Sequence, residues 1–338
     1  MPRVTLLDVS RHAGVSRATA SLVVRGSPRV APTTAARVRE AIVELGYVYD
    51  RAAANLRQSR SMTLGLVMTD LSNPFFAELT MAFEHDVHEQ GYTLFIGYTR
   101  DDLDRQARTL SAMVERRVDG VCLLPALGTT EASLAPLDSQ HVPTVLFTRH
   151  LGGGRPYVGA DNVSAGRMLG EHLRSLGVRH LAFVGGQETS SRRERVEGLL
   201  AGAGDDVRID LPPIYSPSST VGGAQAVSQL LDAGILPDAV VAYNDVIAMG
   251  VNVALWERGL EPGRSIALAG FDDIRIAAGQ VPGLTTVATR SEEVGRSCAE
   301  LLLGYLGGEP PAPRTVLEEP ELRIRASTGL WRPRMETS

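Results

Sequence analysis

From Met62 onward, short apolar runs alternate with segments of helical periodicity, and this alternation restricts the fold more than any other feature of the sequence. Strands separated by helices in this way form βαβ units, which build parallel sheets covered by helices on both faces. The body is therefore predicted to be α/β, with doubly wound parallel sheets. The expected strands are 62–69, 92–98, 118–124, 143–148, 181–185, 238–243, 266–271 and 323–327, and the expected helices are 75–90, 102–117, 162–177, 191–203, 221–233, 245–258 and 291–307.

The first 60 residues differ from this body in charge. They hold ten arginines against four acidic side chains, whereas the whole chain has 34 basic and 39 acidic residues. A basic N-terminal segment on an acidic body indicates a module that binds nucleic acid or an anionic membrane surface.

Two short helices joined by a glycine turn are predicted in this basic segment. Thr5 and Asp8 form a capping-box pattern at the start of the first helix. Gly14 supplies the positive φ of a tight turn, and Ser16 caps a second helix that ends near Val24. This arrangement is typical of an all-α helix-turn-helix module.

A third helix is predicted between Pro32 and Gly46, the glycine closing it as a C-terminal cap. The segment could be a purely structural three-helix unit with solvated arginines. DNA binding is favoured because Arg17 and Ala18 lie in the first turn of the second helix, where side chains reach base edges in the major groove. Phosphate contacts that set the register are expected from Ser16, Thr19, Ser21 and Arg29.

Short motifs recur in a fixed order along the chain. In the basic segment they are VTLLDV (4–9), AGVS (13–16), TASLVV (19–24) and ELGY (44–47), and in the body GLV (65–67), NPFF (73–76), RRVDG (116–120) and GFDD (270–273). From about residue 4 to residue 330, the sequence resembles the LacI/GalR family of bacterial transcriptional regulators.

The resemblance implies a domain organisation. It predicts a helix-turn-helix headpiece at 1–47, a hinge at 48–60, a body at 61–330 and a tail at 331–338. The body should be similar to type I periplasmic binding proteins, with lobe 1 at about 61–160 and 290–320 and lobe 2 at about 161–288 and 321–330. A small-molecule effector is expected in the cleft between the lobes, where strand ends converge.

Two segments depart from the family pattern. In the family, the hinge folds on the operator, pairs with its dimer mate and inserts a leucine into the minor groove; the matching residue is Leu56. On the residues alone, 51–57 fits a plain linker helix as well. In the hinge, Tyr49-Asp50 replaces the usual Pro-Asn.

The second departure is in the recognition helix, where Leu22 stands at a position at which the family commonly has arginine. A different operator base is expected there, because leucine offers only apolar contact. Thr5 completes the expected DNA-binding set.

Polar side chains gather where predicted strands end and helices begin. Asp161, Asn244 and Asp272 follow strands, and Arg195 lies on the helix that begins near Ser191. Each alone could be simply a helix cap, which is the better interpretation of Asp161 or Asn244 by itself, but together they suit a ligand rich in hydroxyl groups. The resemblance assigns these four residues to the effector cleft and adds Phe75, Arg149 and Arg290 near it. It implies a sugar or sugar derivative, with purines as an alternative, and the replacement of a frequent aspartate by Thr148 leaves the ligand open.

The sequence contains no catalytic signature such as GxSxG, HExxH or a P-loop. His85 and His88 are three residues apart, a spacing that fits an exposed helix face better than a metal site. No catalytic residue, metal or cofactor is expected. No run approaches the ~18 apolar residues that cross a bilayer, and the N-terminus has no apolar signal core, so a cytoplasmic protein without membrane association is expected.

The leading hypothesis is a ligand-responsive repressor that binds a near-palindromic operator as a homodimer, because one headpiece reads only a few base pairs. A solute-binding protein for transport shares the two-lobed body, but a basic headpiece and a missing signal sequence oppose it. A cytosolic sugar-processing enzyme is the third hypothesis, which turnover of a sugar by the purified protein would favour.

Overall fold

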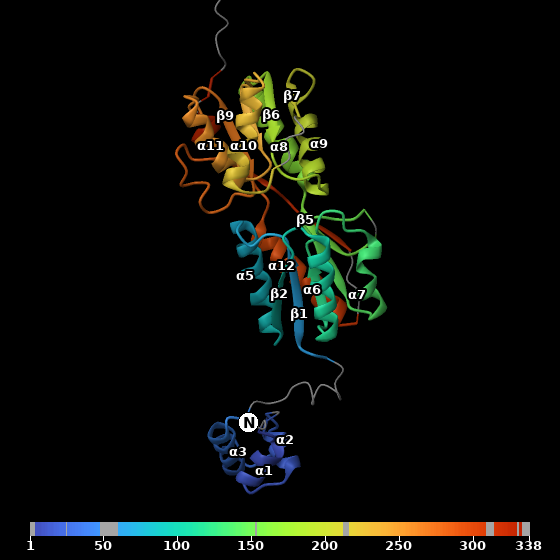
Figure 1. Ribbon diagram of the computed structural model, residues 1–338. Helices are drawn as coiled ribbons and strands as arrows, with labels where there is room; N and C mark the ends of the chain where they lie inside the picture. Colours follow the sequence, from blue (N-terminus) through green and yellow to red (C-terminus); the bar gives the residue numbers. More distant parts are fainter. Residues whose placement is uncertain are drawn as a thin grey trace, which may run out of the picture. The chain divides into compact units, whose positions relative to one another are not determined.

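The computed structural model describes residues 4–24, 26–47, 60–152, 154–211, 216–308, 314–329 and 331–332. The chain divides into two compact units, Met1–Ser61 and Met62–Ser338, which Figure 1 shows in one view. Leu56 and the Tyr49-Asp50 departure of the hinge lie outside the described residues.

The first unit is a three-helix headpiece. Its helices are α1 (Leu6–His12), α2 (Arg17–Val24) and α3 (Pro32–Leu45). Thr5 and Asp8 form the predicted capping box, and Gly14 and Gly46 take the predicted left-handed conformation, each with φ of +62°. The helices share a small apolar core that includes the fully buried side chains of Val9, Ala20 and Val38.

The second unit contains two six-stranded sheets, one in each lobe. The lobe 1 sheet has the order β11-β5-β4-β3-β1-β2, and the lobe 2 sheet has the order β12-β10-β9-β8-β6-β7. All strand pairs are parallel except β10 with β12. The strands of lobe 1 are β1 (Thr63–Met68), β2 (Thr93–Tyr98), β3 (Gly120–Leu123), β4 (Thr144–Phe147), β5 (Tyr157–Ala160) and β11 (Thr315–Glu318). Those of lobe 2 are β6 (His180–Val184), β7 (Arg208–Asp210), β8 (Ala239–Ala242), β9 (Ala267–Phe271), β10 (Thr285–Ala288) and β12 (Glu321–Arg323).

Helices cover both faces of each sheet (Figure 1). Alternate side chains of β1 show this: Leu66 packs in the core with helices α5 and α12, whereas Val67 packs in the core with α6 and α7. The helices of lobe 1 are α5 (Pro74–Glu89), α6 (Leu103–Glu115), the 3₁₀ turn η1 (Glu131–Leu134), α7 (Ala135–Ser139) and α12 (Ser291–Leu306). Those of lobe 2 are α8 (Asn162–Ser175), α9 (Ser190–Ala203), α10 (Thr220–Asp232), α11 (Asp245–Glu257) and α13 (Ala326–Gly329).

The doubly wound α/β prediction is confirmed, with one element placed wrongly. The strand predicted at 323–327 is replaced by β12, which ends at Arg323, and by the short helix α13. Ser327 explains the difference, because its hydroxyl donates to Leu268 O and accepts from Thr285 N, which holds this segment across the sheet without a strand. Three strands, β7, β10 and β11, were not predicted, and β5 was expected only as a strand that ends before Asp161, without bounds. Each of these four strands has four residues or fewer.

Glycines set the distance between α8 and α9. A Cβ atom at Gly198 would lie 2.0 Å from Val163 O, and one at Gly202 would lie 2.1 Å from Arg167 O. Gly166 and Gly170 of α8 face α9 backbone in the same way. The two backbones therefore touch, which fixes the position of α9 and of the arginine that it carries toward the strand ends.

Among the described residues, no helix is long and apolar enough to cross a membrane. In the same residues, no group of three or more His, Cys, Asp or Glu side chains has the arrangement of a metal site. Cys122 and Cys298 are both buried free thiols.

Candidate DNA-binding and ligand-binding sites

The second helix of the headpiece turns a polar face to solvent. Ser16 caps it by accepting a hydrogen bond from Thr19 N over 3.1 Å. Arg17 and Ala18 in the first turn are exposed, whereas Ala20 and Val23 are buried against the other helices. A helix with this split presents its N-terminal side chains outward, the geometry required of a recognition helix.

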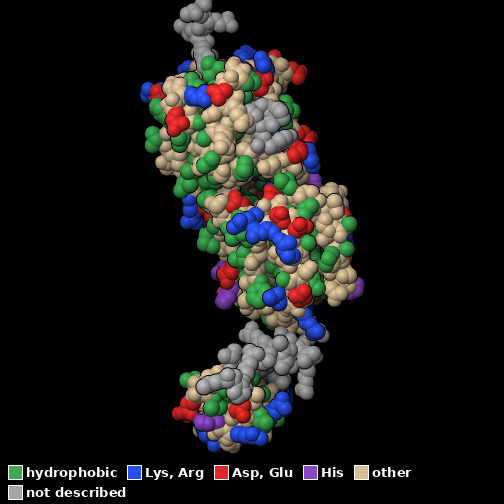
Figure 2. Space-filling model, in the orientation of Figure 1, with side chains coloured by type: hydrophobic (Ala, Val, Ile, Leu, Met, Phe, Trp, Pro, Cys, Tyr) green, Lys and Arg blue, Asp and Glu red, His purple; other side chains and the backbone are tan. Residues whose placement is uncertain are grey.

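The other predicted DNA contacts lie close to this helix in sequence. Ser21 is half-buried and Leu22 has 37% of its surface exposed. Arg29 is exposed, and neither Arg29 nor Arg17 forms an ion pair with another described residue. Both guanidinium groups are therefore available to an external anion. Figure 2 shows arginine side chains on the headpiece surface.

Thr5 already has an intramolecular role. Its hydroxyl donates to Asp8 Oδ2 over 2.6 Å, and these side-chain hydrogen bonds lower the pKa of Asp8. Thr5 can accept a further hydrogen bond at this exposed position. Leu56, the expected minor-groove wedge, lies outside the described residues.

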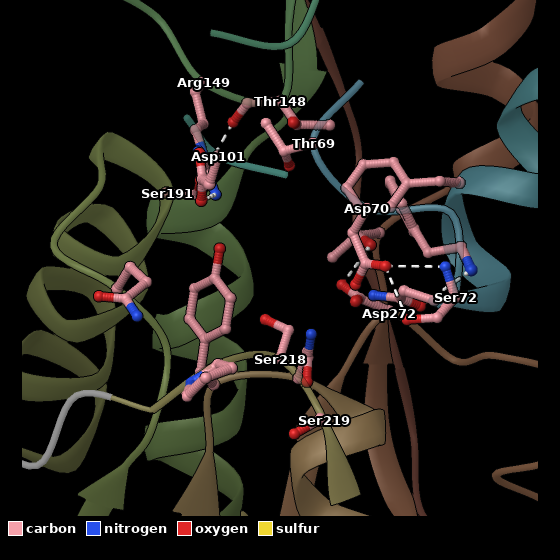
Figure 3. A pocket seen from close by; sticks show the side chains of 18 of the residues that line it. Thr69, Asp70, Ser72, Asp101, Thr148, Arg149, Ser191, Ser218, Ser219 and Asp272 are labelled. Atoms are coloured by element: carbon pink, nitrogen blue, oxygen red, sulfur yellow. Dashed lines mark hydrogen bonds and ion pairs between the residues drawn. The ribbon is translucent and has the colours of Figure 1, made fainter. Parts of the chain in front are cut away.

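In the second unit, the carboxyl ends of strands from both sheets open onto a cavity of about 530 Å³ (Figure 3). Lobe 1 contributes residues that follow β1, β2, β3 and β4, and lobe 2 contributes residues that follow β8, β9 and β10 together with α9. The volume lies within the range of ordinary small-molecule sites. Of the seven residues expected here, the lining contains Phe75, Arg149, Arg195, Asn244 and Asp272.

Arg195 is the most constrained of these side chains. Its Nη2 donates to Asp272 Oδ1 over 3.1 Å, its Nε donates to Asn162 Oδ1 over 2.9 Å, and its Nη1 donates to Tyr243 O over 2.6 Å. The guanidinium also lies 5.0 Å from the Tyr243 ring centroid and 4.8 Å from that of Phe271. These contacts fix its plane at the cavity wall.

Asp272 follows β9 in a left-handed backbone conformation, with φ of +108°. Burial raises the pKa of its carboxyl group, and Arg195 and the hydroxyl of Thr289 oppose that rise. The side chain of Asn73, which caps α5 in lobe 1, also lowers the pKa of this carboxyl group. The charge of Asp272 is thus influenced by side chains of both lobes at the cavity.

The lobe 1 wall carries a second ion pair, shown in Figure 3. Arg149 Nη1 lies 2.6 Å from Asp101 Oδ1, and Nη2 lies 3.1 Å from Oδ2. Phe75 packs edge-on against Phe76 at 5.3 Å between ring centroids, and both rings line the cavity. An aromatic wall of this kind suits the apolar face of a sugar ring or a purine.

The structure does not bring Asp161 and Arg290 to the cavity lining. Both carboxylate oxygens of Asp161 are bound by Ser164, one by its N–H and one by its hydroxyl, so this residue caps α8. Arg290 donates to Glu321 Oε2 over 2.9 Å. Asn244 combines both roles, because its Oδ1 caps α11 through Ile247 N while the residue lines the cavity.

Sequence reasoning missed several lining residues, among them Asp101, Asn162, Tyr243 and Thr289. The rule that parallel strands present functional groups at their carboxyl ends would have found Asp101, which lies three residues after β2. It could not have found Thr289, because β10 itself was not predicted.

Comparison with known sequences shows which family the chain belongs to. Residues 5–50 match the profile described as "Bacterial regulatory proteins, lacI family", and residues 171–328 match the "Periplasmic binding protein-like domain". The maltose regulon regulatory protein MalI of Escherichia coli K12 is 31% identical over 335 residues, which cover 93% of this chain and 96% of that protein. The chain belongs to the LacI family.

Other relatives of this LacI-family regulator support the same family assignment. The ribose operon repressor of Escherichia coli K12 is 32% identical over 305 residues, covering 88% of this chain and 92% of that protein. The CelR–cellobiose complex has a TM-score of 0.71 at 30% identity and covers 96% of this chain and 100% of that one. The lac repressor dimer bound to operator and the anti-inducer ONPF has the same fold, with a TM-score of 0.84 at 24% identity over 97% and 99% of the two chains.

Proposed function

We propose that this LacI-family regulator represses transcription as a homodimer on a near-palindromic operator, and that a sugar or sugar derivative in the interlobe cavity controls its affinity for DNA. The observation that carries the proposal is the combination of two features: an exposed Arg17, without an ion-pair partner among the described residues, on a capped recognition helix, and a polar cavity at the strand ends of the body. Neither feature alone indicates a DNA-binding regulator that a ligand controls.

In the headpiece, Arg17 and Ala18 read base edges in the major groove. Thr5, Ser16, Thr19, Ser21 and Arg29 hold the phosphate backbone, and Leu22 makes an apolar contact with a base. Leu56 is the minor-groove wedge of the proposal, and this role rests on the family resemblance alone.

In the body, Arg195, Asn244 and Asp272 bind ligand hydroxyl groups from lobe 2, while Phe75 and Arg149 face them from lobe 1. The names of relatives support a sugar: one is a maltose regulon regulator, one a ribose operon repressor, and one is solved with cellobiose. Asp161 supports this site from outside the lining, because it caps α8, whose first residue, Asn162, lines the cavity. Arg290, paired with Glu321, takes no part in the proposed site.

Exposed apolar side chains support the homodimer. The edge strand β2 exposes Phe95 and Ile96, and helix α11 exposes Val253 and Trp256. An exposed apolar edge strand is a template for pairing unless another surface covers it, and a second copy of the chain would cover both lobes. Figure 2 shows apolar side chains on the surface of each lobe. A regulator of this kind acts on DNA in the cytoplasm and has no catalytic role.

A thermal-shift screen of sugars, sugar derivatives and purines tests the ligand class. A ligand at ~100 times its dissociation constant adds about 2.7 kcal/mol to the stability of the body. An operator selected from random DNA then reports whether the same compound changes DNA affinity. A purine hit would replace the sugar in the proposal, and turnover of the compound or failure to select any DNA would reject the repressor.

A further inference from the structure

The charged side chains that line the cavity balance one another. Three are acidic, Asp70, Asp101 and Asp272, and three are basic, Arg100, Arg149 and Arg195. The two arginines with little exposure, at 16% and 8% of the side chain, are the two that pair with carboxylates. The cavity therefore presents two neutralised ion pairs, one on each lobe, to any ligand.

The pair in lobe 1 is a fork-to-fork contact. Arg149 uses both Nη atoms on Asp101, and Nη1 also donates to Pro125 O over 3.0 Å. Asp101 Oδ1 accepts a further hydrogen bond from Leu127 N, again over 3.0 Å. The contact thereby joins the segments that follow β2, β3 and β4. It leaves two N–H groups of Arg149, the Nε–H and one on Nη2, without an acceptor among the described residues.

The backbone at Asp101 is held in an uncommon conformation. Arg100 and Asp101 are consecutive non-glycine residues with φ of +57° and +60°. Left-handed backbone of this kind costs free energy, and it persists where surrounding contacts determine the geometry, commonly at ligand sites. Asp and Asn tolerate this conformation best, so the side chain at 101 can be changed to Asn without adding strain.

We propose that Asp101 determines the charge specificity of the cavity: by neutralising Arg149 it admits uncharged polyhydroxylated ligands and excludes phosphorylated or carboxylated ones. The proposal rests on the proposed function, because it takes this cavity as the effector site. A hydroxyl group can accept from either of the two remaining N–H groups of Arg149. An anionic group that approaches Arg149 also approaches the Asp101 carboxylate paired with it, and like charges repel.

Arg100, the lining cation without a carboxylate partner among the described residues, does not change this conclusion. Its guanidinium lies 5.6 Å from the Tyr98 ring centroid, and the residue is exposed. Solvent and salt screen an exposed charge, so Arg100 alone does not retain an anion in the cavity.

Inorganic phosphate tests the proposal without a known effector. Thermal unfolding of the full chain is followed by tryptophan fluorescence in phosphate and in chloride of equal ionic strength. Both tryptophans, Trp256 and Trp331, belong to the second unit, so the signal reports the unfolding of that unit, and any effect of phosphate at the headpiece is common to the parent and the variants. We expect no saturable phosphate effect in the parent. We expect saturable binding by Asp101→Asn, with a dissociation constant at least tenfold below the highest phosphate concentration that leaves the parent unchanged.

Two further variants control this comparison. Asp104→Asn removes the same charge from an exposed position in the first turn of α6, outside the cavity lining, and should behave like the parent. Arg149→Gln combined with Asp101→Asn should abolish the gained phosphate binding. Saturable phosphate binding by the parent overturns the proposal, and this arm requires no variant to fold. The proposal is also overturned if Asp101→Asn and Asp104→Asn are both folded and respond equally to phosphate.

Matched ligand pairs provide a second arm in the parent protein. D-Ribose is compared with D-ribose 5-phosphate, and D-glucose with D-glucose 6-phosphate. The proposal predicts that wherever one member of a pair binds, the neutral member binds at least tenfold more tightly; preference for the phosphate overturns it. If no sugar or purine of the broader screen binds, the proposed function fails, while the phosphate comparison still decides the role of Asp101.

Discussion

Arg195 and Asp272 form an ion pair 3.1 Å apart in which both side chains are more than nine-tenths buried. The pair links α9 to the end of β9, at the wall of the cavity. A buried pair of this type fixes a geometry more than it adds net stability, because its Coulomb attraction is offset by the desolvation of both ions. Its loss, in contrast, leaves one charge buried without a partner.

Arg195→Ala should therefore destabilise the second unit by about 3–5 kcal/mol, since the Asp272 carboxylate stays buried and unpaired. Urea unfolding followed by tryptophan fluorescence measures the change. Arg193→Ala is the matched control two residues earlier on α9, where the side chain is 64% exposed and lies 3.8 Å from Glu188; it should change stability by less than ~0.5 kcal/mol. Equal effects of the two variants would show that the pair has no special energetic role.

Arg17→Ala should relax base preference at one symmetric pair of operator positions, at about 1–3 kcal/mol per contact. The reason is its exposed place in the first turn of α2. Arg29→Ala is the comparison, because a phosphate contact should weaken binding equally on all sequences. Selection of operators from random DNA with each variant separates the two roles; a uniform loss with Arg17→Ala would reassign it to the backbone.

DNA binding should depend steeply on salt. Two headpieces, each with an excess of arginine, neutralise roughly 6–10 phosphates, which gives a log–log slope of affinity against salt of about −5 to −9. Fluorescence anisotropy at salt concentrations from about 50 to about 200 mM measures this slope. A slope near zero would contradict the electrostatic part of the DNA-binding account.

Gly198→Ala should destabilise the second unit by about 1–3 kcal/mol or more, because the added methyl group would overlap Val163 O and force α8 and α9 apart. Gly279→Ala is the matched control: its Cβ would meet only Ile276 O, at 3.7 Å, in an open position. Thermal unfolding of both variants measures the difference. If they unfold alike, the close approach of α8 and α9 is not required.

The sequence predicts the strong, regular elements and the chemistry at their ends. The long helices of the body carry a clear period, and the headpiece follows from its caps and turns, so both were found. β10 was missed because its four residues, TTVA, have little apolar pattern. Its burial comes from neighbouring strands, which a local pattern cannot show.

The residues of the cavity show the same limit of prediction from local sequence patterns. Arg195 and Asp272 are 77 residues apart in sequence. Their predicted places near strand and helix ends, together with the family resemblance, associated them with one site, but no local pattern could predict their direct contact. Asp161 seemed equivalent to Asp272, since both follow strands. The difference between them is local: Ser164 occupies both oxygens of Asp161, whereas Asp272 faces the cavity.

The central claim is that ligand in the cavity and operator on the headpiece are coupled. Operator affinity measured with and without the ligand found by screening, together with ligand affinity measured with and without operator, tests it most directly. Linkage requires the same factor in both directions, typically about 5- to 150-fold, and Asp272→Asn should remove it. Operator affinity that is identical in the absence and presence of saturating ligand would contradict the account.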